Sequence, residues 1–192
     1  MCVNKGFMES VNKSIGSIVK GTGDIVNAIA DDISGLVSKL VKETGKTGEA
    51  FMDSIQHIIG TTIRGVNEVG KDMEDGVKAV VIGILKGLKT NGDETFSTLE
   101  GLAGSVIKTA ADTKSDVAAA TRGLIKGVIH SAKEMGVDAE KAAIAAATSA
   151  VEAADKISKE AGEAVRKAAT GTFDGIRVVL KEYVEKEAKR KG

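Results

Sequence analysis

Apolar residues recur every 11 positions along this chain. Counted from Val11, they occupy positions 1, 4, 5, 8 and 9 of each repeat, and the register continues to Val184 without a slip. Of the 27 basic and 27 acidic residues, only Glu74, Lys114 and Glu140 fall in these five columns. Because 11 residues complete three helical turns, the columns lie side by side on one face of a straight or slightly right-handed helix. The pattern predicts an all-α chain of long amphipathic hendecad helices, as in a coiled coil, and argues against strands, whose period is two.

Turn-favouring residues interrupt the pattern at three places, 44–48, 91–95 and 136–138, each of which holds a glycine at position 5 of the repeat. Position 5 alternates between large residues and weak helix formers, which gives a superperiod of 22 residues. In the last cluster Gly136 is placed to end a helix and Asp138 to cap the next one. Breaks at all three clusters would give an up-down four-helix bundle with helices of about 42 residues.

The unbroken register favours a second architecture. A loop has no evident reason to preserve the phase of the repeat, so the constant phase indicates helices that run on through the weak points. In this interpretation residues 1–192 form a single hendecad-repeat region, either extended or folded into a hairpin at 91–95. The apolar face is wider than a two-stranded seam requires, so each helix should touch at least two neighbours. We expect such helices in an oligomeric assembly, with the monomeric bundle as the alternative.

The large apolar side chains of the five columns are the candidate assembly face, because so large an apolar surface is not stable in water. They are Ile18, Ile25, Val26, Ile29, Ile33, Leu36, Leu40, Phe51, Ile55, Ile58, Val66, Val69, Val77, Val80, Ile84, Leu88, Leu99, Leu102, Val106, Val117, Leu124 and Val128.

Small residues gather at the flank of this face, where they would let helix backbones approach closely. The candidate close-packing glycines are Gly65, Gly76, Gly83, Gly87, Gly123, Gly127, Gly171 and Gly175.

Charge and composition narrow the function. The net charge of zero removes the basic footprint expected of a nucleic-acid-binding protein. One cysteine excludes an intramolecular disulfide framework. The longest apolar run, Ala79–Leu85, is too short to span a membrane, and no secretory signal is visible. We therefore expect a cytoplasmic protein by default, although a processed extracellular form would look the same.

No residues in the sequence form a recognisable catalytic, cofactor or metal site. His57 and His130 fall outside the apolar columns, and neither has a ligand-like partner at metal-binding spacing. Gly45-Lys46-Thr47 lacks the first glycine and the preceding strand of a phosphate-binding loop. The sequence predicts a protein that is not an enzyme and that uses no cofactor.

Segments rich in Ala, Lys, Glu and Thr, such as residues 110–114 and 142–159, resemble late-embryogenesis-abundant proteins. The 11-residue amphipathic repeat is also similar to those of phasin-type, perilipin-type and apolipoprotein-type coat proteins. The first resemblance fits the mean hydropathy of −0.01 poorly, and apolipoprotein repeats are punctuated by Pro, which is absent here. The coat-protein resemblance implies binding to a lipid-droplet, membrane or polymer-granule surface.

Two functions therefore follow as expectations. The first is a structural protein that associates with copies of itself, through its apolar face, into a filament, tube, sheath or helical bundle. The alternative is an amphipathic coat on a lipid or granule surface, where the same face would lie in the interface.

Overall fold

The computed structural model describes residues 5–20, 25–44, 49–88 and 93–180. This part of the chain is helical apart from its turns and one short hairpin, so the all-α fold class is confirmed. The helices are α1 (Lys5–Val19), α2 (Ile25–Thr44), α3 (Glu49–Glu68), α4 (Met73–Leu88), α5 (Asp93–Asp112), α6 (Val117–Met135), α7 (Ala139–Asp155) and α8 (Lys159–Ala169). The antiparallel strands are β1 (Gly171–Phe173) and β2 (Ile176–Val178).

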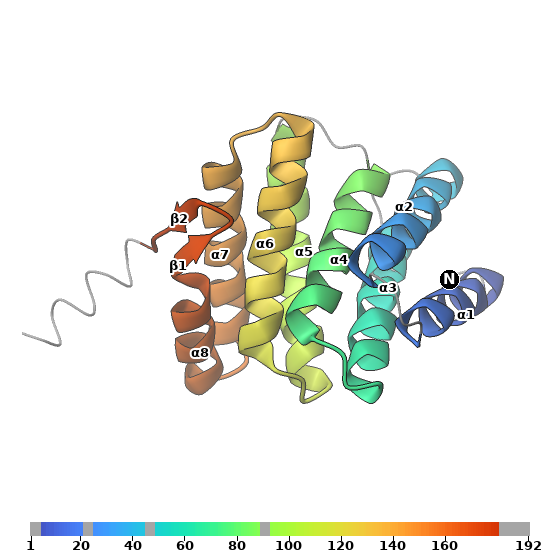
Figure 1. Ribbon diagram of the computed structural model, residues 1–192, viewed down its shortest axis with the longest axis horizontal. Helices are drawn as coiled ribbons and strands as arrows, with labels where there is room; N and C mark the ends of the chain where they lie inside the picture. Colours follow the sequence, from blue (N-terminus) through green and yellow to red (C-terminus); the bar gives the residue numbers. More distant parts are fainter. Residues whose placement is uncertain (1–4, 21–24, 45–48, 89–92, 181–192) are drawn as a thin grey trace, which may run out of the picture.

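The helices stack in two layers (Figure 1). In one layer α2, α4, α6 and α8 contact one another in that order, and in the other layer α1, α3, α5 and α7 do the same. Successive helices alternate between the layers, so each repeating unit is a pair of antiparallel helices. The result is a helical-repeat stack whose apolar core lies between the two layers.

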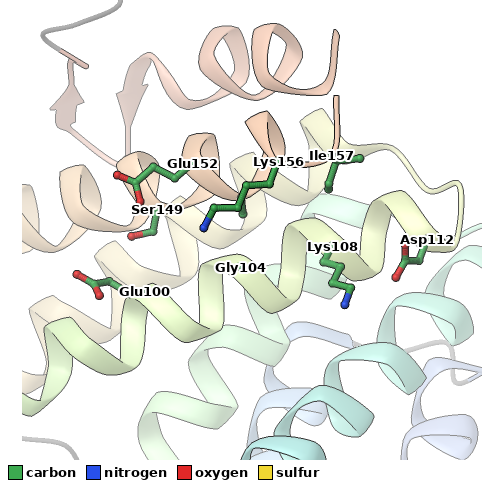
Figure 2. A pocket seen from close by; sticks show the side chains of 9 residues that line it. Glu100, Gly104, Lys108, Asp112, Ser149, Glu152, Lys156 and Ile157 are labelled. Atoms are coloured by element: carbon green, nitrogen blue, oxygen red, sulfur yellow. The ribbon is translucent and has the colours of Figure 1, made fainter. Parts of the chain in front are cut away.

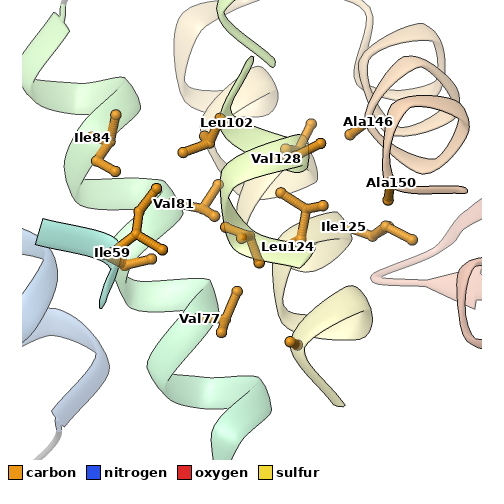
Figure 3. Packing of buried hydrophobic residues seen from close by; sticks show 14 of the residues in the cluster. Ile59, Val77, Val81, Ile84, Leu102, Leu124, Ile125, Val128, Ala146 and Ala150 are labelled. Atoms are coloured by element: carbon orange, nitrogen blue, oxygen red, sulfur yellow. The ribbon is translucent and has the colours of Figure 1, made fainter. Parts of the chain in front are cut away.

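The middle of the stack is the most apolar part because it is covered on every side but one. In α4 all seven residues of Ala79–Leu85 are buried, and only Asp75 and Lys86 are exposed in this helix. Figure 3 shows side chains of α4, such as Val81, converging on Leu124 of α6. The apolar run in the sequence therefore marks the central helix of the stack.

Three helices end in the same way, at residues separated by multiples of 22 positions. Gly70, Lys114 and Gly136 have φ angles of 65°, 54° and 70°, all in the left-handed region. In each case the residue's amide donates to the carbonyl three residues back, and the next amide donates to the carbonyl five residues before it. This is the Schellman arrangement, which satisfies the free carbonyls at a helix C-terminus.

The following helices begin two residues later with an aspartate cap. The carboxylates of Asp72, Asp116 and Asp138 accept hydrogen bonds from the amides of Glu74, Ala119 and Lys141, at 2.8, 2.9 and 3.0 Å. A side-chain acceptor at this place satisfies one of the amides that a helix N-terminus leaves free. The sequence predicts the boundary at 136–138 with its Gly136 and Asp138, and the structure has it.

The expectation of long helices is wrong for the described residues, where helices have 11 to 20 residues. The four-helix bundle is wrong for the same reason, because turns at 69–72, 113–116 and 156–158 divide what would be its helices. Of the predicted weak points, Thr44 is the last residue of α2, residues 45–48 and 91–92 lie outside the described residues, and 93–95 belong to α5. The phase survives the turns because one helix plus its turn spans about 22 residues, which is two repeats of 11.

The chain leaves the helical pattern at residues 171–178. Asp174 and Gly175, with φ angles of 47° and 83°, form the two-residue turn between Phe173 and Ile176. Two positive φ angles are typical of the type I′ turn, which an Asp-Gly pair favours. The Nζ of Lys133 donates to the Asp174 carbonyl at 2.9 Å and fastens this hairpin to the end of α6. A single helical region over residues 1–192 is therefore not what the structure shows here.

Candidate functional site

Four of the candidate glycines lie where helices of the α2–α4–α6–α8 layer meet. A Cβ atom at Gly83 would lie 2.7 Å from the carbonyl oxygen of Ala30, and one at Gly87 would lie 2.7 Å from the Cβ of Val37. At the next contact a Cβ on Gly127 would lie 2.8 Å from the Cβ of Val81. The neighbouring Gly123 faces the backbone of α4 even more closely. Helix backbones in this layer approach each other at distances that only glycine permits.

The remaining candidate glycines have other environments. A Cβ at Gly76 would clash with Val66 of α3, so this glycine serves the contact between the two layers. At Gly65 a Cβ would make only ordinary contacts with Val19. Gly171 and Gly175 are not in a helix: their φ angles of 155° and 83° belong to the β-hairpin. The expectation of helical close packing is wrong for these last two.

Ion pairs cross the same contacts on their solvent side. The Nζ of Lys86 on α4 lies 2.8 Å from the Asp31 carboxylate on α2. The Glu74 carboxylate on α4 forms ion pairs with two residues of α6, the Nε of Arg122 at 2.7 Å and the Nζ of Lys126 at 2.5 Å. Burial raises the pKa of the Glu74 carboxyl, but the hydrogen bonds and charges of Lys126 and Arg122 outweigh it and hold the pKa below its usual range. These pairs bind the helices of the layer to one another.

The candidate assembly face lies inside the chain. Of its residues, only six are not fully buried: Val69 is exposed, and the partly buried ones are Ile18, Ile25, Val26, Leu36 and Val117. The others belong to one continuous core shared by all the helices. Within the described residues, a single chain therefore covers the apolar surface from which association between copies was expected.

The opposite layer has an open groove between α5 and α7 (Figure 2). Its volume is about 620 Å³. Small residues lie between its walls, and they are Gly104 of α5 with Ser149 and Ala153 of α7. A Cβ at Gly104 would meet nothing within 4 Å. The space beside this glycine is therefore open, whereas a neighbouring helix fills the space beside the glycines of the other layer. No signal in the sequence distinguished Gly104 from the close-packing glycines.

Charged residues form the two ends of this groove. Glu100 and Glu152 lie toward one end, on either side of Ser149, and Lys108 and Asp112 lie toward the other. The Lys156 side chain extends into the groove between them, and Ile157 lies at the rim. The two glutamates come from different helices and make no ion pair with any residue that the structure describes. Ile157 is 44% exposed, the highest value among the large apolar residues described. The groove is thus an open surface with three carboxylates, two amines and an apolar rim rather than an enclosed ligand pocket.

Metal-ligating residue types are not clustered in the described ranges. No group of three or more His, Cys, Asp and Glu residues there could hold a metal ion. His130, on the exposed side of α6, lies 3.5 Å from Glu134 one turn later. His57, which also falls outside the apolar columns, is half-buried between α1 and α3, and its Nε2 has no hydrogen-bond partner among the described residues.

Comparisons with known proteins find similar chains only among solved structures. No family model matches this chain, and no curated protein matches it. Among solved structures, a de novo designed helical repeat protein is similar over 86% of this chain and 91% of its own, with 16% identity and a TM-score of 0.48. Among the described helices, none has the length and apolar character that crossing a membrane requires.

Proposed function

We propose that this chain is a non-enzymatic structural protein, a self-contained stack of short helices that acts as a scaffold and receives a partner helix in the α5–α7 groove. The observation that carries the proposal is the burial of the apolar columns within one chain, together with one groove surface left open. A rigid stack with an extended surface is the usual binding architecture of helical-repeat proteins.

Self-assembly through the apolar face has lost its main driving force. The residues expected to meet other copies already bury their side chains in the core, so association would have to use a different surface. At the two ends of the stack Glu160, Glu163 and Lys167 are exposed on α8, and Gly35 and Lys39 are exposed on α2, where Ile25, Val26 and Leu36 are partly buried. Polar outer faces of terminal repeats keep such stacks soluble and limit end-to-end growth.

A lipid or granule coat would require the two layers to separate. The amphipathic helices could reach an interface only by exposing the core that now joins them. Flotation with neutral-lipid droplets separates the proposals: the scaffold should stay with the aqueous fraction and keep its helical content. Co-flotation with a gain in helicity would favour the coat.

The groove proposal commits to a partner of stated chemistry, namely an amphipathic helix. Its contact face would carry small residues over Gly104, Ser149 and Ala153, because small residues let the partner backbone approach the floor. It would carry a Lys or Arg at the end where Glu100 and Glu152 lie, since neither carboxylate forms an ion pair within the described part of the chain. Helix-in-groove recognition uses side chains three, four and seven residues apart in this way.

The test uses two synthetic helices that are rich in Ala and differ only in one pair of residues, Lys in the first and Glu in the second. The wild-type chain should bind the Lys helix more tightly, as measured by fluorescence anisotropy. The double variant Glu100→Lys/Glu152→Lys should reverse this preference, because the acidic end becomes basic. A matched control, Glu160→Lys/Glu163→Lys on α8, should leave it unchanged. Equal binding of both helices by all three proteins would overturn the groove proposal.

A further inference from the structure

The contact of α1 with the stack is looser than those between the inner helices. α1 is the first helix of its layer and packs on α3 and α2 (Figure 1), and it buries Phe7, Val11, Ile15 and Val19. A Cβ at Gly65 of α3 would lie 3.8 Å from Val19, which is an ordinary contact, whereas the glycines between α4 and α6 leave no room for one. An open groove of about 330 Å³ lies between α1 and α3. A terminal helix with such a contact is the part of a stack expected to open first.

His57 of α3 fastens this helix through one of its two ring nitrogens. The ring donates a hydrogen bond to the backbone carbonyl of Met8 in α1. The other nitrogen, Nε2, is buried and has no partner among the described residues. A neutral imidazole has one donor and one acceptor nitrogen, so in this arrangement Nδ1 carries the proton and Nε2 is the acceptor. The neutral ring is therefore compatible with the docked position of α1.

The protonated ring is not compatible with this position. A second proton makes Nε2 a donor in a closed space where no described residue accepts from it, and an unpaired buried donor costs free energy. The charge is also unfavourable there, because the Arg64 guanidinium acts on the ring and no described carboxylate does so. The charged side chains of the surrounding helices that do not contribute to the shift of the His57 pKa are Glu9, Lys13 and Lys20 of α1, Asp32 of α2, and Asp53 and Glu68 of α3.

These interactions determine the direction of the pH effect. Burial lowers the pKa of His57 and the charge of Arg64 lowers it further, while the hydrogen bond to Met8 opposes both. When α1 moves away, the ring enters water and its pKa returns to about 6.5. The docked state is therefore favoured above that pH, and the open state gains as the pH falls below it. Asp32 acts in the opposite sense, because burial raises the pKa of its carboxyl.

We propose that His57 makes the docking of α1 dependent on pH, so that protonation of its Nε2 releases α1 and exposes the apolar faces of α1 and α3. Nε2 is closed off in the docked state, so the proton binds after α1 has moved and then opposes its return. The ordinary pKa of an exposed imidazole sets the upper limit of the effect. With protonation of the open state alone, the open population rises about 30-fold between pH 7.5 and pH 5. This device is independent of the α5–α7 groove.

Amide hydrogen exchange of the full chain, followed by NMR at pH 7.5 and pH 5, measures the opening of α1. Each observed rate is divided by the intrinsic rate of an exposed amide at the same pH, which gives an opening constant for that amide. The constants of buried α1 residues such as Ile15 should rise about 5- to 30-fold in acid. They should also exceed the constants of α4 amides at both pH values. Equal constants in the two helices would mean that the whole chain unfolds together, and would overturn the release of α1.

Two variants isolate the titration of His57. His57→Asn removes the titrating ring and keeps a side-chain N–H that can donate to the Met8 carbonyl. Its effect on packing applies at both pH values, so the ratio of the opening constants should be no more than about twofold. The matched control His130→Asn replaces the exposed histidine of α6 and should keep the wild-type ratio. A wild-type ratio near one, or an equal ratio in His57→Asn, would overturn the proposal.

Discussion

Replacement of Lys114 by glycine tests the 22-residue repeat of helix ends. The substitution should raise the free energy of unfolding at a helix end, whereas it would lower it inside a helix. Lys114 stands where Gly70 and Gly136 stand in the neighbouring turns, and its φ angle of 54° is in the left-handed region. Its amide bonds to the Ala111 carbonyl at 3.0 Å, and the following amide of Ser115 bonds to Ala110 at 2.8 Å. Both bonds use the backbone alone, so Lys114→Gly keeps them.

The expected gain follows from two opposing effects. A residue with a Cβ pays roughly 1–2 kcal/mol for the left-handed conformation. Glycine removes that strain but loses about 0.5–1 kcal/mol through its more flexible unfolded state. The Lys114 side chain is exposed and forms no ion pair within the described ranges, so little else is lost. Lys114→Gly should therefore stabilise the chain by about 1 kcal/mol, which raises Tm by about 2–4 °C in a chain of this size.

Urea denaturation followed by circular dichroism measures this change. The matched control is Lys108→Gly, the same substitution at an exposed position inside α5. It should destabilise by about 0.7–1 kcal/mol, because glycine is a poor residue in a helix interior. If Lys114 lay within a continuous helix, the two variants would lose stability equally. Equal losses would refute the assignment of a helix end at this residue.

Three further predictions concern the contacts that hold the stack together. Gly127→Ala should cost about 1–3 kcal/mol in urea denaturation, because the new methyl group would overlap Val81, whereas Gly104→Ala in the open groove should be neutral or stabilising by up to about 1 kcal/mol; equal effects would contradict the close contact of α4 with α6. Glu74→Gln should lower stability at neutral pH by an amount on the order of 1 kcal/mol. The pKa of Glu74 in the folded chain is below its usual value, so the stabilisation from its ion pairs is present above the unfolded pKa and disappears as the pH falls through the folded pKa. The free energies of unfolding of the variant and the wild type should therefore converge in acid. A difference that persists there would argue against an ionic contribution. Gly175→Ala should cost about 1 kcal/mol, because residue 175 has a φ angle of 83°, and an unchanged urea midpoint would contradict the turn assigned to Asp174 and Gly175.

Much of the fold was accessible from the sequence because burial follows the helical period. The five apolar columns predicted helices and most of the core, including Ile33, Ile58 and Leu124. The helix length was not predicted, since phase kept across a turn looks the same as phase kept along a helix. Lys114 concealed one turn, because a charged residue occupies a position that glycine fills elsewhere.

Other features depend on which helices become neighbours. The Asp174-Gly175 pair was a visible hairpin signal that the regular register obscured. The grooves left no such signal: Lys108 and Lys156 are 48 residues apart in sequence, and only the stacking of α5 on α7 brings them to one surface. The position of the Arg64 guanidinium against the buried Gly60 likewise depends on a side-chain conformation that a helical period does not determine.

The central claim is that one chain covers its own apolar face by stacking short helices. Small-angle X-ray scattering with in-line light scattering measures this most directly. A compact chain of 192 residues should have a radius of gyration of roughly 16 Å, somewhat more for an elongated stack. The mass should remain 19.8 kDa at every concentration. A mass that rises with concentration, or the profile of a rod approaching the roughly 280 Å of a continuous helix, would contradict the account.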